Sequence, residues 1–181
     1  MTKKPTGNWK SMLLKALYLQ ITFLILHYAY DFFPNPVTEI FSGVSEAVYQ
    51  HMKIAFYSYA LVSLIEFLIK RKQGHHAEKI GFARIGATVL YPWLIFTLFF
   101  TPPAYYGEYQ TIWAEIVSAN IVLYISSLGA IFIEREFEKV ILSKEFKIMI
   151  VLLFVILVSL FTIYTYRDPW FDVFAIPPGW E

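Results

Sequence analysis

The chain has 181 residues, of which 57% are hydrophobic and 19% aromatic, and its mean hydropathy is +0.52. We expect a single compact membrane domain over residues 1–181, without a separate soluble module. The formal net charge is only +1, and the absence of cysteine excludes disulfides, thiolate metal sites and cysteine nucleophiles.

Five apolar stretches alternate with short polar connections, which predicts an all-α bundle of five transmembrane helices. A crossing helix needs about 20 apolar residues. The predicted crossings cover about residues 12–30, 46–69, 82–101, 111–133 and 148–166. The first is expected to be a retained anchor rather than a signal peptide, because its long run carries Gln20 and His27 and has no small-residue cleavage site.

Turn and breaker residues indicate where several of these helices begin and end. Ser45 followed by Glu46 resembles the opening turn of the second helix. Pro92 lies near the middle of the third helix, and Pro102 and Pro103 are expected to stop it.

The basic residues are strongly partitioned among the connections. Thirteen of the fifteen Lys and Arg residues fall at the N-terminus or in every second connection: Lys3, Lys4, Lys10, Lys15, Lys70, Arg71, Lys72, Lys79, Arg84, Arg135, Lys139, Lys144 and Lys147. Short loops rich in Lys and Arg stay in the cytoplasm, so we expect a multi-pass plasma-membrane protein with its N-terminus cytoplasmic and its C-terminus outside. Topology and anionic lipid account for the basic loops, and no nucleic-acid partner is implied.

Ionisable groups at membrane depth are costly and therefore mark candidate functional sites. His27, Glu46, His51 and Glu115 all fall in the predicted outer half. Two imidazoles and two carboxylates suit a divalent metal such as zinc, iron or manganese. The same groups can pass protons, since histidine titrates near neutrality.

Three further residues are candidates for the surroundings of this site: Asp31, Lys53 and Asn120. Asp31 follows His27 by four positions and so shares its helix face. Lys53 has a second interpretation, in which it snorkels outward or pairs with Glu46 or Glu115.

Other ionisable residues have simpler explanations. Glu66 lies one turn from Lys70, and the two are expected to form an interfacial ion pair. His75 and His76 lie in a basic loop and are expected to be solvated.

These patterns support three functional hypotheses. The first is a site for a metal, cation or small molecule that serves metal-dependent chemistry or proton-linked movement. The second is an accessory subunit, in which the buried charges pair with those of a membrane-protein partner or a second copy. The third is an electron carrier in which His27 and His51 ligate one haem b iron. No reaction is assigned, because the chain has no His-Glu-x-x-His, glycine-rich phosphate loop or serine elbow.

The start of the second predicted crossing carries a more specific pattern. Residues 41–53 read Phe-Ser-Gly-Val-Ser-Glu-Ala-Val-Tyr-Gln-His-Met-Lys. This segment resembles the motif Phe-Ser-x-Val-Asn-Glu-x-x-Trp-Glu-His-x-Lys of a family of small, uncharacterised prokaryotic integral membrane proteins. In that family a histidine ends the first helix, as His27 does here, and residues 161–164 are similar to the end of its last helix.

The resemblance implies that Glu46, His51 and Lys53 belong to one shared site, and it implies no particular reaction. The chain departs from the motif, which usually has Asn, Trp and Glu, at Ser45, Tyr49 and Gln50. The amide of Gln50 cannot act as an acid, a base or an anionic ligand, so any such role of the family's glutamate is lost at this position.

Overall fold

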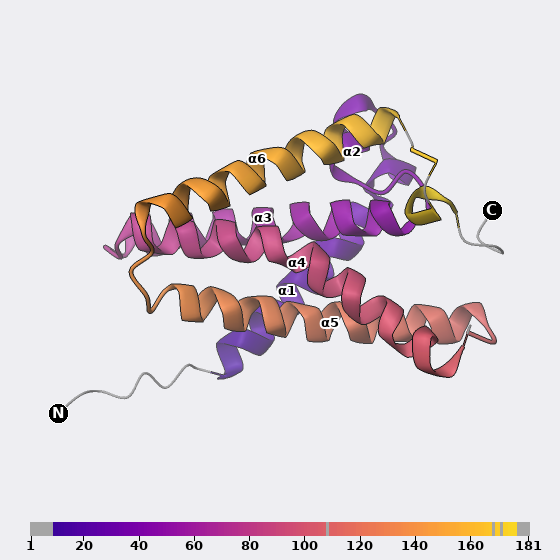
Figure 1. The fold of residues 1–181 in the computed structure, drawn as a ribbon, viewed down its shortest axis with the longest axis horizontal. Coiled ribbons are helices and arrows are strands. Elements are labelled where there is room, and N and C mark those ends of the chain that lie inside the picture. Colours follow the sequence, from indigo (N-terminus) through magenta and orange to yellow (C-terminus); the bar gives the residue numbers. More distant parts are fainter. Residues whose placement is uncertain (1–8, 108, 168, 171, 177–181) are drawn as a thin grey trace.

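The computed structural model describes residues 9–107, 109–167, 169–170 and 172–176. Its long helices are α1 (Trp9–Phe32), α3 (Val48–Lys72), α4 (Ala77–Tyr106), α5 (Ile112–Phe137) and α6 (Lys144–Tyr166). A short helix α2 (Pro36–Phe41) and a 3-10 turn η1 (Asp172–Phe174) lie at one end (Figure 1). All five long helices are apolar enough to cross a membrane, which confirms the prediction of an all-α, five-helix, multi-pass membrane protein.

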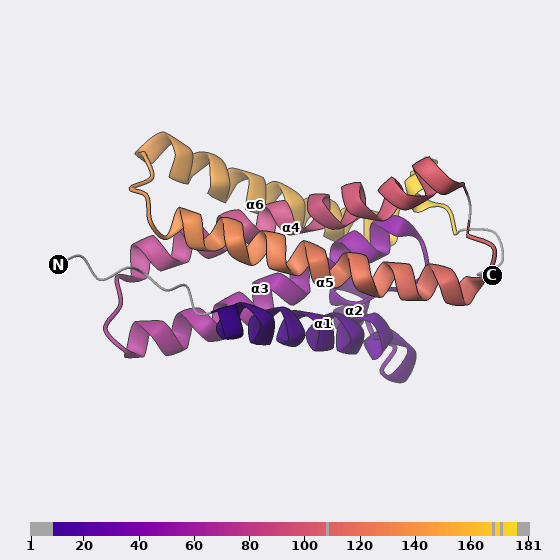
Figure 2. The ribbon, with the colours of Figure 1, turned by 90° about the horizontal axis from the view of Figure 1, so that it is seen from below.

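Four of the helices surround a common core, and the fifth lies outside it. α1 packs on α3 and α5, and α4 packs on the other sides of both (Figures 1 and 2). The core between them contains Leu19, Ile54, Ala87, Tyr91 and Ile131, all buried. Half of the apolar window of α3 is buried, against 11% of that of α6. α6 therefore leaves most of its apolar surface exposed outside the bundle core.

The two ends of the bundle differ in charge. Both views place the starts of α1, α4 and α6 at the same end as the last turns of α3 and α5 (Figures 1 and 2). Because Lys70, Arg71 and Lys72 end α3 there, we call this the basic end. The opposite end holds α2, the 42–47 loop and η1, and we call it the acidic end.

A buried ion-pair network ties four helices together toward the basic end. Its members are Lys15 of α1, Glu66 and Lys70 of α3, Arg84 of α4, and Glu134 and Glu138 of α5. Lys15 Nζ lies 2.6 Å from Glu66 Oε2 and 2.7 Å from Glu134 Oε2. Arg84 Nη1 lies 2.8 Å from Glu138 Oε1. Three cations and three anions balance, which is what burial of charge at membrane depth requires.

The predicted pair of Glu66 and Lys70 is present, with 3.1 Å between Oε1 and Nζ. It is one edge of the larger network rather than an isolated interfacial pair. The sequence pattern had placed Lys15 and Arg84 among the basic residues of the predicted cytoplasmic side, yet they are only 8% and 3% exposed.

Two predicted helix ends need correction. α3 begins at Val48 with Ala47 as its N-cap, so Glu46 lies in the preceding loop rather than in the first helical turn. α4 continues through Pro102 and Pro103 to Tyr106, because a proline removes a backbone donor without always ending a helix. The helix ends instead at Gly107, whose φ of +82° is one that glycine adopts without strain.

Candidate metal centre

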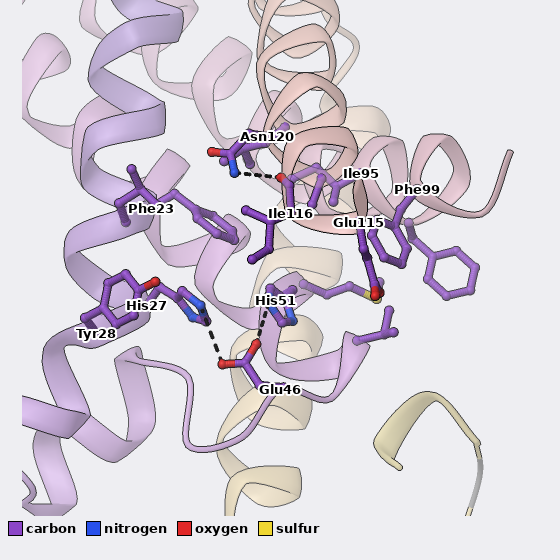
Figure 3. A pocket seen from close by; sticks show the side chains of 16 residues that line it. Phe23, His27, Tyr28, Glu46, His51, Ile95, Phe99, Glu115, Ile116 and Asn120 are labelled. Carbon is purple, nitrogen blue, oxygen red and sulfur yellow. Dashed lines mark hydrogen bonds and ion pairs between the residues drawn. The ribbon is translucent and has the colours of Figure 1, made fainter. Parts of the chain in front are cut away.

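A cavity of about 190 Å³ lies between α1, α3, α4 and α5 toward the acidic end (Figure 3). All four residues predicted to form a site line it: His27, Glu46, His51 and Glu115. Asn120 lines it as well. The fold therefore brings together groups that are up to 93 positions apart in the chain, from His27 to Asn120.

Three of these side chains converge on one point. Glu46 Oε1 lies 3.7 Å from His27 Nε2, and Glu46 Oε2 lies 3.5 Å from His51 Nε2 (Figure 3). One ligand atom from each residue can be chosen so that all three lie within 4.8 Å of one another. Among the described residues, no other group of three histidine or carboxylate ligands comes this close.

The separations fit ligands around an ion better than direct hydrogen bonds. Hydrogen bonds between nitrogen and oxygen are about 2.7–3.2 Å long. Around a tetrahedral zinc ion with bonds of about 2.0–2.1 Å, neighbouring ligand atoms are about 3.4 Å apart. The observed 3.5 and 3.7 Å lie nearer to that second value, although they end on different oxygens of Glu46. With one ligand atom from each residue the three lie within 4.8 Å, so a bound ion would draw them slightly closer together.

His51 is held in an orientation suited to ligation. It lies in the first turn of α3, and its Nδ1 is 3.1 Å from the carbonyl oxygen of Ala47. When Nδ1 carries the proton and donates it to that carbonyl, the lone pair of Nε2 faces Glu46. Ligating histidines commonly donate their second ring nitrogen in this way, which fixes the tautomer and the ring.

His27 enters the cavity from α1, and its ring packs between two aromatic neighbours. The ring centroid lies 4.7 Å from that of Tyr28 and 6.2 Å from that of Phe23. The two imidazole rings are 5.1 Å apart. Side-chain exposure is 15% for His27 and 31% for His51, so both side chains are partly buried and still accessible to solvent.

The loop that carries Glu46 is held tightly on both sides. Asn35 caps α2, accepting hydrogen bonds from the backbone N–H groups of Val37 and Thr38. After α2, the chain passes close to α3 and α1: a Cβ on Gly43 would lie 2.9 Å from Ile54 Cδ1 of α3 and 3.5 Å from His27 Nδ1 of α1. Glycine at this position lets the loop pack against α1 and α3, which brings the carboxylate of the loop between the two imidazoles.

Glu115 and Asn120 enter the cavity from α5, which packs directly on α1 (Figure 3). Glu115 is half-buried and stays outside the group of three converging ligands. Asn120 donates to the carbonyl oxygen of Ile116, and its Oδ1 accepts a hydrogen bond of 2.7 Å from Gln20 Nε2. That bond joins α1 to α5 beside the cavity.

The two remaining predicted neighbours lie elsewhere. Asp31 is exposed near the end of α1 and does not line the cavity. Lys53 is fully buried, so it does not snorkel outward. Its Nζ donates to the backbone carbonyl of Glu39 at 2.9 Å and to Thr165 Oγ1 at 3.0 Å, which joins α3 to α2 and α6.

Comparisons with protein-family models, curated proteins and solved structures give no match for this chain. Its function is therefore inferred from its own residues and their arrangement.

Proposed function

We propose that this integral membrane protein binds a divalent transition metal between His27, Glu46 and His51, with zinc as the first candidate. The observation that carries the proposal is the convergence of three ligand atoms, from α1, a loop and α3, within 4.8 Å. Two imidazoles and one carboxylate form a donor set of catalytic zinc sites and of non-haem iron sites.

Three protein ligands leave a coordination position open, and here that position borders the cavity. A zinc ion held by these three residues would supply an open position at which water could be activated as a nucleophile at neutral pH. Glu115 lines the same cavity from α5 and would be the candidate base. The proposal thus assigns metal-dependent chemistry to the site and leaves the substrate to be identified.

The distribution of Lys and Arg supports an orientation for this site. Short basic connections stay cytoplasmic, so the basic end is proposed to face the cytoplasm of a cell with this protein in its plasma membrane. The N-terminus is then inside and the C-terminus outside. The metal centre, at the acidic end, opens toward the outer half of the membrane.

The arrangement favours a single ion over the two other hypotheses. Both imidazoles approach the same carboxylate, with ring centroids 5.1 Å apart, and a haem macrocycle would have to fit between the rings. The accessory-subunit hypothesis rested on buried charges that need a partner. Among the residues on which that hypothesis rested, His27 and His51 approach Glu46, and Lys53 donates to Glu39 and Thr165, all within the described part of this chain.

Titration with Co²⁺, a spectroscopic substitute for zinc, tests the proposal. The purified protein in mild detergent should bind one Co²⁺ per chain and develop the visible absorption of a low-coordinate cobalt site, and zinc should displace the cobalt and remove the band. A spectrum that stays that of hexaaqua-cobalt throughout the titration would refute the metal centre.

A further inference from the structure

The cavity has two chemically different parts. The three converging ligands occupy one side of it. Most of the remaining wall is apolar and includes Phe23, Ile95, Phe96, Phe99, Ile116 and Leu123. The other polar residues along the wall are Tyr28, Glu115 and Asn120. A small set of polar groups at one end of a mostly apolar cleft is typical of sites for organic ligands.

This wall does not suit the passage of a hydrated ion. Ion pathways are lined by carbonyls or charged side chains that replace the lost hydration shell. Here phenylalanine and isoleucine side chains follow the metal ligands directly. An apolar chain would gain binding free energy against this wall, whereas a hydrated ion would lose its hydration shell there without replacement.

The cavity also reaches the exposed surface of α1, a helix apolar enough to cross a membrane. Leu24 and Tyr28 of α1 both line it, and they are 38% and 50% exposed. A ligand with a hydrocarbon chain can therefore approach from the bilayer rather than from water.

From these observations we infer that the cavity takes an amphiphile with an oxygen-donor head group and a hydrocarbon chain. The head group, such as a carboxylate or an acyl carbonyl, would bind the metal at the open coordination position in place of water. The chain lies along the apolar wall formed by α4 and α5. This inference rests on the proposed metal centre and adds the class of ligand that the centre receives.

Alkyl hydroxamates of increasing length, from acetohydroxamate to hexanohydroxamate, provide the test. Hydroxamates bind metals through two oxygens, and these members are soluble enough to be titrated against the Co²⁺-loaded protein while its visible band is followed. Each methylene that enters an apolar site is expected to tighten binding by up to about fourfold. We expect at least about a tenfold gain in affinity across the series.

Two phenylalanine substitutions on α5 show where the chain lies. Ala119 lines the cavity, so Ala119→Phe should fill it and reduce the gain across the series to less than about threefold. Ala119→Leu adds a smaller side chain to the cavity, so the gain in affinity across the series should fall between those of the wild type and Ala119→Phe. Val117 is 56% exposed and outside the cavity, so Val117→Phe is the matched control and should keep the full gain.

The failures of the two proposals are distinguishable. Absence of a cobalt band in the wild-type protein would overturn the metal centre itself. With the band present, an affinity that is flat along the series, or a gain that survives in both Ala119 variants, would overturn the inference about the amphiphile. That result would leave the metal centre standing.

Discussion

Replacing Glu134 by alanine should destabilise the protein by about 3–5 kcal/mol. The carboxylate is 2% exposed and accepts hydrogen bonds from Lys15 Nζ at 2.7 and 2.8 Å and from the Tyr59 hydroxyl at 2.9 Å. Without it, the ammonium group of Lys15 keeps one carboxylate neighbour, and three cations face two anions in the network. Uncompensated charge at a buried position is the source of this cost.

Glu136→Ala is the matched control, because it removes a carboxylate from the same helix. The Glu136 side chain is 45% exposed and pairs with Lys139 at the surface, so its loss should change stability by less than about 1 kcal/mol. The free energy of unfolding in one mild detergent is the quantity to compare. Equal effects of the two substitutions would contradict the structural role assigned to the network.

A double variant separates the loss of the Lys15–Glu134 ion pair from the loss of side-chain packing. Lys15→Met combined with Glu134→Gln removes one charge of each sign, so the network stays neutral. The double variant should therefore lose less stability than the sum of the two single variants. Strict additivity would mean that the two side chains do not interact across α1 and α5.

His51→Ala should weaken zinc binding by at least about 100-fold, and His27→Ala should have a similar effect. Loss of a residue that merely orients a metal ligand costs about 10–100-fold in affinity, and loss of a ligand itself should cost at least as much. Calorimetric titration of zinc into each purified variant gives the affinity. Because neither histidine is fully buried, the variants should fold normally.

His75→Ala is the control that removes a histidine outside the proposed metal centre. His75 is exposed and lies just beyond α3 at the basic end, far in sequence from the three ligands. It should leave zinc affinity unchanged. If His75→Ala weakened binding as much as His51→Ala did, the bound metal would not be at the proposed centre.

Much of the architecture follows from the sequence, because the bilayer leaves the backbone few choices. Within lipid, every peptide group must be hydrogen-bonded inside the chain, so long apolar stretches become helices. The ends of the helices were harder to predict from the sequence. Pro102 and Pro103 were expected to stop α4, yet the helix runs to Tyr106, because loss of a donor weakens a helix without necessarily ending it.

The candidate site could be found in part from the cost of placing ionisable groups at membrane depth. That rule singled out His27 and His51, which do meet, with ring centroids 5.1 Å apart. It could not show that Glu46 lies in a loop before α3 and reaches both imidazoles from there. This position depends on the close passage of the chain at Gly43, a tertiary contact that leaves no periodic pattern.

The network near the basic end was missed for a related reason. Lys15, Arg84 and Glu134 each lie close to a predicted membrane boundary, where a charged side chain is ordinarily solvated. Their burial depends on which helices are neighbours, and hydropathy carries no information about that. The hydrogen bond between Gln20 and Asn120 was hidden for the same reason.

X-ray absorption at the zinc K-edge is the most direct test of the metal centre. The zinc-loaded protein should show nitrogen and oxygen ligands at about 2.0–2.1 Å, with the outer-shell scattering of two imidazole rings. In His51→Ala, at metal concentrations that force binding, the imidazole scattering should fall to that of one ring. An all-oxygen shell in the wild-type protein, or two imidazoles that persist in His51→Ala, would contradict a centre built from His27, Glu46 and His51.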